Sequence, residues 1–199
     1  MAREFQDRVL DLVHSSLRTA MDRESCPAFM RRPGMLECGA LWETISQAYH
    51  ALTGLVLPDV MPSRERRQLD AIVTLRDGSS CVVEVDEVQH FNAFRALTLQ
   101  HYPSGSRVAF DPGVWLQHSL ASTKLRGGGW ADPKPPLFPG ENGRHRQRAF
   151  RDMLADLLPA EYGWAPTLRI AYFEVEDWLG QPDATERMSA LLGTKTHPG

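Results

Sequence analysis

The chain has few cysteines, no long apolar run and no marked excess of charge of either sign. Its 199 residues include three cysteines, Cys26, Cys38 and Cys81, which are widely spaced and form no CxxC pair. This spacing argues against a disulfide framework or a zinc cage and for a reducing compartment. No run approaches about 18 apolar residues, and the N-terminus lacks the apolar core of a signal peptide. We therefore expect a cytoplasmic protein with no membrane partner.

The bulk composition is that of an ordinary globular protein. Hydrophobic residues make up 42% of the chain and charged residues 24%, which argues against wholesale disorder. The formal net charge of −3 gives no global indication of nucleic-acid binding, so local basic clusters carry more information than the sum. The length suits one well-buried domain, and we expect residues 1–199 to form it.

The hydrophobic pattern predicts an alternation of helices and strands around one loop rich in proline and glycine. Helices are expected at 4–23, 35–53, 91–102, 113–125, 144–158 and 183–192, and strands at 55–60, 68–75, 80–86, 107–110 and 167–175. The loop spans 127–143, and a loop of this length inside a domain is usually functional or disordered. Residues 144–199 would complete the domain as helix, strand and helix. This order predicts an α/β protein with a mixed sheet and helices around it.

Two of these strands carry carboxylates at positions where strands disfavour them. Asp70 lies in the strand at 68–75, and Glu84 and Asp86 lie in the strand at 80–86. Clustered carboxylates repel each other unless a cation lies among them. Hard oxygen ligands of this kind suit Mg²⁺ or Mn²⁺. The pattern favours a metal site on a hairpin, and the alternative is an edge hairpin whose acids face solvent.

The length of the turn decides whether the carboxylates meet. A two-residue loop would place Asp70 on the opposite face from Glu84 and Asp86, because side chains alternate along a strand. A three-residue loop at 76–78 instead pairs Asp70 with Glu84, and Gly78 supplies the left-handed residue that such a loop requires. The apolar residues of both strands then share one face, so we predict the three-residue loop. Asp70 and Glu84 would lie about 5 Å apart at Cβ.

The motif D-x13-E-V-D-x-x-Q-H resembles the PD-(D/E)xK nuclease superfamily, in particular the branch related to very-short-patch-repair endonucleases. It is formed here by Asp70, Glu84, Asp86, Gln89 and His90. That branch continues with a helix that bears an arginine, which corresponds to Arg95, and a strand that corresponds to 107–110. The resemblance covers roughly residues 35–111, the nuclease-like core. Two positions depart from the pattern, because Asp86 replaces the lysine of the superfamily's name and Glu87 replaces the usual glycine.

The resemblance implies a restriction-endonuclease-like fold, a mixed β-sheet core flanked by helices. It also implies an Mg²⁺- or Mn²⁺-dependent endonuclease that hydrolyses phosphodiester bonds, with DNA as the expected substrate, by a metal-activated water. Asp70 and Glu84 would be the principal metal ligands, and Asp86 a third ligand or a group that positions water. A small domain with one site would need a homodimer to cut both strands together.

Other residues are candidates for supporting roles. Gln89 could hold a ligand water or a phosphate, and His90 could act as a general base, orient the attacking water or cap the next helix. Glu37 and Glu43 are possible accessory acids, although each also suits a solvated helix face.

Basic and aromatic residues supply candidate contacts to nucleic acid. These candidates are Arg66, Arg67, Arg95, Lys124, Trp130, Arg144, Arg146 and Arg148. Arginines at a helix start are unfavourable with the helix dipole, which indicates an anion nearby, and Trp130 could stack on an unpaired base. The alternative for the arginines is a solvated helix face.

Two other functions stay open from the sequence. The chain could be a nucleic-acid-binding protein on the same fold that has lost catalysis, as the missing lysine suggests. It could also be a protein-interaction subunit of a larger defence or repair complex, with the loop and C-terminal half as docking surface. In that case alanine at Asp70 would leave function intact and deletion of the loop would abolish it.

Overall fold

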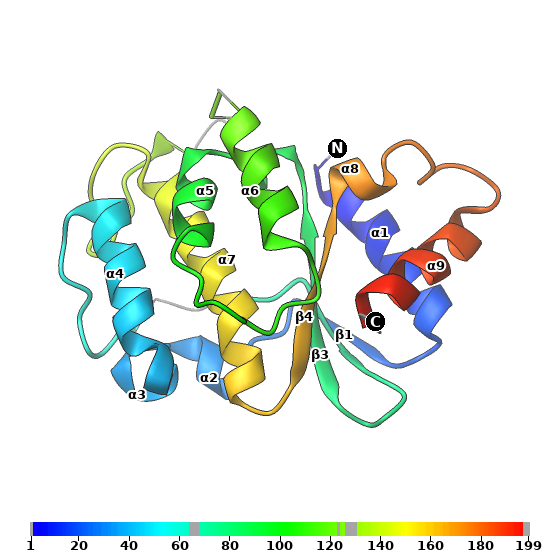
Figure 1. The fold of residues 1–199 in the computed structure, drawn as a ribbon, viewed down its shortest axis with the longest axis horizontal. Helices are drawn as coiled ribbons and strands as arrows, with labels where there is room; N and C mark the ends of the chain where they lie inside the picture. Colours follow the sequence, from blue (N-terminus) through cyan, green and yellow to red (C-terminus); the bar gives the residue numbers. More distant parts are fainter. Residues whose placement is uncertain (1, 64–67, 123, 126–130, 197–199) are drawn as a thin grey trace.

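One mixed β-sheet runs through the centre of the molecule (Figure 1). The computed structural model describes residues 2–63, 68–122, 124–125 and 131–196. Within these residues the sheet has the strand order β1-β2-β3-β4. The strands are β1 (Met21–Arg23), β2 (Ala71–Thr74), β3 (Ser80–Asp86) and β4 (Ala165–Ala171). The pairs β1/β2 and β2/β3 are antiparallel, whereas β3/β4 is parallel. The chain is therefore a mixed α/β protein.

Helices cover both faces of this sheet. They are α1 (Ala2–Leu17), α2 (Ala28–Arg31), α3 (Met35–Cys38), α4 (Trp42–Thr53), α5 (Ala93–Leu99), α6 (Pro112–Ala121), α7 (Gly143–Glu161), α8 (Tyr172–Val175) and α9 (Ala184–Thr196), with short 3-10 turns η1 (Gly39–Leu41) and η2 (Val88–His90). Figure 1 shows α1, α8 and α9 on one side of the sheet and α4, α5, α6 and α7 on the other. Across the described ranges, no helix combines the length and the apolarity that crossing a membrane requires.

Alternation along β2 and β3 divides their side chains between two apolar clusters. Ala71, Val83 and Val85 pack with residues of α1 and α9. Ile72 and Val82 pack instead with residues of α4 and α7. Because side chains alternate along a strand, the even-numbered residues of β3, which include Glu84 and Asp86, face the α7 side.

The N-terminal helix is shorter than the sequence suggested. The apolar spacing predicts a helix at 4–23, but α1 ends at Leu17 and Arg18 adopts a φ of +52°, which breaks the helix. The chain then forms β1, whose Met21 lies opposite Val73 of β2. The prediction was wrong here because three residues are too few for a strand to show a period.

Four other segments differ from the expected elements. Neither 55–60 nor 107–110 forms a strand, and within the second segment Ala109 makes an isolated bridge to Leu168. The strand expected at 167–175 begins at Ala165 and ends at Ala171. There the Glu174 carboxylate accepts a hydrogen bond from the Ala171 N–H, which caps the start of α8. The helix expected at 35–53 is divided into α3, η1 and α4 and ends at Gly54, whose φ is +73°.

The described part of the proline- and glycine-rich loop packs on the core. Leu137 and Phe138 are buried, and the Tyr49 hydroxyl donates a 2.6 Å hydrogen bond to the Leu137 carbonyl. At the first residue of α7, a Cβ on Gly143 would lie 2.3 Å from the Phe138 carbonyl oxygen, so the close contact requires glycine. The loop therefore fixes where α7 begins.

Candidate active site

The β2–β3 turn has the three-residue form that the sequence predicts. The Leu75 N–H donates to the Ser79 carbonyl at 2.8 Å, and Gly78 has a φ of +85°. Ala71 lies opposite Val83, and the same register places Asp70 opposite Glu84. The predicted pairing is confirmed.

Hydrogen bonds to the backbone hold the Asp70 and Glu84 carboxylates side by side. The Val85 N–H donates to Asp70 Oδ2 at 2.9 Å, and the Asp70 N–H donates to Glu84 Oε1 at 3.2 Å. Asp70 is half-buried, whereas Glu84 has only 1% of its surface exposed. The backbone of β3 at Val85 thus fixes the Asp70 carboxylate, and the backbone of Asp70 fixes the Glu84 carboxylate.

These two carboxylates line a pocket of about 260 Å³ that also receives three arginines of α7. The pocket is lined by Gln6, Gln68, Asp70, Glu84, Val85, Glu87, His90, Arg144, Arg148, Arg151 and Asp152. Arg144, Arg148 and Arg151 are spaced by four and three residues, so they share one face of the helix. The pocket therefore places the acids of the β2–β3 hairpin opposite the guanidinium groups and Asp152 of α7.

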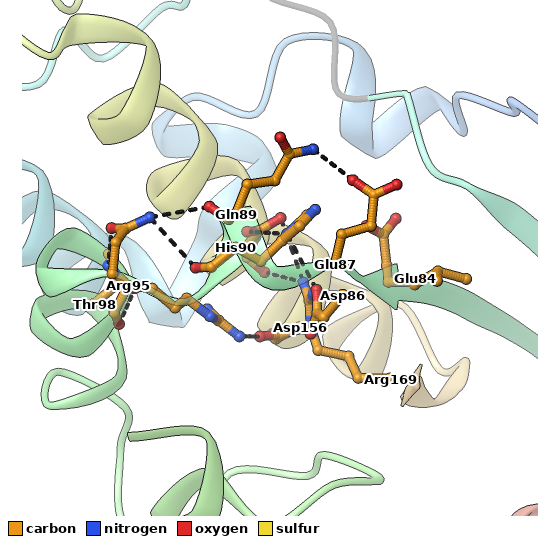
Figure 2. Close-up of polar contacts among 12 residues, drawn as sticks. Glu84, Asp86, Glu87, Gln89, His90, Arg95, Thr98, Asp156 and Arg169 are labelled. Atoms are coloured by element: carbon orange, nitrogen blue, oxygen red, sulfur yellow. Dashed lines mark hydrogen bonds and ion pairs between the residues drawn. The ribbon is translucent and has the colours of Figure 1, made fainter. Parts of the chain in front are cut away.

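His90 lies between two buried aspartates at the edge of this pocket. Its Nδ1 is 3.1 Å from Asp152 Oδ2 and 3.1 Å from Asp86 Oδ1. Figure 2 shows Asp86, the last residue of β3, close to His90 of η2. The ligand atoms of Asp86, His90 and Asp152 are close enough together to hold a metal ion. A histidine held through Nδ1 by a carboxylate has a fixed ring orientation and can present Nε2 to a water or a substrate.

Asp86 has different surroundings from those the sequence suggested. It is 1% exposed; its Oδ1 accepts from Arg169 Nη1 at 2.5 Å and its Oδ2 from Trp115 Nε1 at 2.7 Å. It does not line the pocket that contains Asp70 and Glu84. Its carboxylate lies in the core beside His90 and Asp152, and its role as a third ligand or a water-positioning group stays a prediction.

Arg169 is the centre of a buried ionic network beneath the pocket. Its Nε donates to Asp156 Oδ1 at 2.5 Å, and its Nη2 donates to the Asp152 carbonyl at 3.1 Å. Asp156 Oδ2 also accepts from Arg95 Nη2 at 2.7 Å, a contact drawn in Figure 2. The Arg169 side chain has no exposed surface, and the surrounding carboxylates, led by Asp156, outweigh its burial and raise its pKa well above the ordinary value. The network joins β3, β4, α5 and α7.

Asp152 connects this network to the pocket. Burial alone would raise the pKa of its carboxyl, but the charges of His90 and Arg169 hold that pKa well below its usual range. Asp152 is therefore ionised at neutral pH, and its Oδ2 lies 3.1 Å from His90 Nδ1.

Several candidate residues lie away from the pocket. Glu37 accepts a hydrogen bond from the Gly34 N–H in α3, and Glu43 is exposed on α4, where it pairs with Gln47. Neither glutamate lines the pocket of Asp70 and Glu84, so the expectation of accessory acids is corrected. Gln89 turns toward Glu87, and its Nε2 donates to that carboxylate at 2.5 Å (Figure 2).

The basic candidates separate into two groups. Arg144 and Arg148 line the pocket, as a role in phosphate binding requires. Arg95 is 1% exposed and pairs with Asp156, so the expected contact with nucleic acid is corrected to a structural role in the core. The Arg146 guanidinium lies 5.3 Å from the centre of the Phe94 ring, and Lys124 is exposed outside the pocket. Arg66, Arg67 and Trp130 lie outside the described residues.

Sequence reasoning missed Asp152, Asp156 and Arg169. A signal was present, because both aspartates interrupt the apolar face of the most periodic helix, and Arg169 interrupts an apolar strand. Charged residues at buried positions are rare unless they are paired. Three such residues in two core elements indicate an internal ion pair, although the sequence gives no partner.

Comparisons with models of known protein families, with curated proteins and with solved structures found no match in any of the three.

Proposed function

We propose that the protein is a divalent-metal-dependent nuclease of the PD-(D/E)xK superfamily, with a restriction-endonuclease-like fold, that hydrolyses phosphodiester bonds in DNA. One observation carries the proposal: a single pocket brings the Asp70–Glu84 pair against Arg144, Arg148 and Arg151 of α7. Carboxylates suit a divalent cation, and guanidinium groups suit the phosphate that such a cation also contacts. An acidic pair alone, or an arginine face alone, would not favour this chemistry.

The donor set fits a hard cation such as Mg²⁺ or Mn²⁺. Asp70 and Glu84 offer carboxylate oxygens from adjacent strands, and backbone N–H groups fix both side chains in advance. Mg²⁺ keeps several of its waters and binds through one or two carboxylates together with substrate phosphates. The chemistry supplied by a bound cation would be polarisation of the scissile phosphate and acidification of the attacking water.

The charges of the pocket link DNA binding to cation binding. Four carboxylates, from Asp70, Glu84, Glu87 and Asp152, face three guanidinium groups. The carboxylates outnumber the guanidinium groups, and this excess of acids disfavours a phosphate. A divalent cation reverses the sign, so DNA should bind the pocket tightly only when Mg²⁺ or Mn²⁺ is present.

His90 and Asp152 are placed to manage the proton of hydrolysis. In this reaction the water oxygen forms a bond to phosphorus, one P–O ester bond breaks, and the water loses a proton while the leaving oxygen gains one. His90 lines the pocket and can accept the water's proton, and the ionised Asp152 at 3.1 Å stabilises the imidazolium that results. The arginines of α7 that line the pocket, Arg144, Arg148 and Arg151, would hold the phosphate during the displacement.

A cleavage assay tests the proposal. Supercoiled plasmid, linear duplex, single-stranded DNA and RNA are incubated with Mg²⁺ or Mn²⁺ and either the wild type, Asp70→Asn or Asp22→Asn. Asp22 is an exposed residue of β1 outside the pocket, so it controls for the loss of a carboxylate. We expect the wild type and Asp22→Asn to cleave DNA and Asp70→Asn to fall to background. Equal cleavage by all three would reveal a contaminant and contradict the proposal.

One observation favours a second function, a DNA-binding protein without catalysis. Asp86 stands at the position of the superfamily's lysine, and its carboxylate is bound to Arg169 and Trp115 in the core. Among the described residues that line the pocket there is no lysine. Divalent metal binding and metal-dependent DNA binding without cleavage would identify this function.

A further inference from the structure

Two acids of the pocket, Glu84 and Asp152, are recessed below the molecular surface together with His90, which limits the form of DNA that can reach them. Glu84 is 1% exposed, Asp152 is 2% exposed and His90 is 8% exposed. The pocket volume of about 260 Å³ lies at the small end of ligand pockets and suits a group no larger than about one nucleotide. A phosphate that approaches Glu84 must therefore enter the pocket.

The arginine row, formed by Arg144, Arg148 and Arg151 of α7, is short as well. Arg144 and Arg151 are seven residues apart on α7, which corresponds to about 10 Å along the helix axis. One turn of duplex DNA extends about 34 Å, so this row matches a local segment of one strand and not a length of duplex. Enzymes that act on a nucleotide outside the base stack bind it in a snug pocket.

We propose that the pocket admits one unpaired nucleotide at a time, so that the phosphodiester that is cleaved belongs to single-stranded DNA or to a frayed or gapped position. This inference rests on the proposed nuclease function. The phosphate of the unpaired nucleotide lies between the arginine row and the Asp70–Glu84 pair. A continuous duplex must first unpair a nucleotide, which costs a few kcal/mol and costs least where the base is already single-stranded.

The test compares DNA substrates that share one sequence and differ in pairing. The four substrates are a single strand, a duplex with a single-stranded 3′ tail, a duplex with an internal unpaired stretch, and a fully paired duplex. The fully paired duplex is closed at both ends by ligated hairpins, and phosphorothioate linkages make the hairpin loops uncleavable. Initial cleavage rates are measured with Mn²⁺ for the wild type, with Asp70→Asn as the control for contaminating nuclease.

We expect cleavage of the three substrates with unpaired nucleotides, mapped to or beside the unpaired region, at least about tenfold faster than cleavage of the closed duplex. This inference would be overturned if the wild type cleaved the closed duplex as fast as the single strand and Asp70→Asn did not cleave it. The nuclease proposal would then stay intact. Absence of Asp70-dependent cleavage on all four substrates would overturn both.

Discussion

Removing the Arg169 guanidinium should lower the free energy of unfolding more than removing any surface charge. Arg169 of β4 has no exposed surface, and it binds Asp86 Oδ1 and Asp156 Oδ1, each at 2.5 Å. The change Arg169→Met keeps most of the side-chain volume and removes the charge. The two carboxylates then stay buried without their main partner.

The size of the effect follows from which partners remain. Breaking a buried ion pair by removing one member costs about 3–5 kcal/mol of unfolding free energy. Asp156 keeps Arg95 at 2.7 Å, and Asp86 keeps Trp115 Nε1 at 2.7 Å, so we expect the lower end of this range. In a chain of this length, a loss of about 3 kcal/mol lowers the melting temperature by about 6–12 °C.

The same change should alter the response to acid. The folded-state pKa of Asp152 is depressed, and Arg169 is one of the charges that depress it. A depressed carboxyl pKa stabilises the fold above the unfolded pKa, about 3.9, and this stabilisation is lost as the pH falls through the folded pKa. The difference between wild type and Arg169→Met should therefore be larger at pH 7 than near pH 3.

Urea unfolding followed by circular dichroism measures both quantities. Arg187→Met is the matched control, because Arg187 pairs with Asp183 on the surface of α9 with 53% of its side chain exposed. We expect this control to stay within about 0.5 kcal/mol of wild type. A loss below about 1 kcal/mol for Arg169→Met at pH 7 would refute the reasoning, since it would mean that the buried carboxylates do not depend on Arg169.

Two further predictions follow from the pocket and from the thiols. Arg148→Gln should weaken DNA binding for all sequences and lower the steepness with which the logarithm of the binding constant falls with the logarithm of salt concentration by about 1. The surface change Arg187→Gln should leave both quantities unchanged. Equal effects of the two changes in a salt titration would contradict phosphate binding by α7. In the native protein at pH 8, a thiol reagent should modify the half-buried Cys26 first, because burial raises the pKa of the Cys38 and Cys81 thiols to about 12. Reaction of all three thiols at the same rate would contradict the burial of Cys38 and Cys81.

The part of the site that the sequence could predict is the part set by local rules. The Asp70–Glu84 pairing depends on a three-residue turn with Gly78 at a positive φ and on the alternation of apolar residues along two adjacent strands. All of this information lies within about twenty residues of chain. Helix α7 could be predicted equally well from the sequence, because its apolar period is strong and its arginines fall at 144, 146, 148 and 151.

The rest depends on contacts between distant segments. Asp152 lies 62 residues after His90, and Arg169 lies 83 residues after Asp86, so no local pattern joins them. Arg95 was misassigned for the same reason: a helical arginine looks like a surface residue until Asp156 is found beside it. The sequence pattern places residues on faces, and the packing of α7 against β3 and β4 decides which charges meet.

The central claim is that Asp70 and Glu84 hold the divalent cation on which DNA cleavage depends. Its most direct test is a titration of Mn²⁺ followed by electron paramagnetic resonance, in the wild type, Asp70→Asn, Glu84→Gln and the exposed control Asp22→Asn. We expect Mn²⁺ binding by the wild type and Asp22→Asn, and at least about tenfold weaker binding by each of the other two variants. Mn²⁺ binding of equal strength in all four proteins would contradict it.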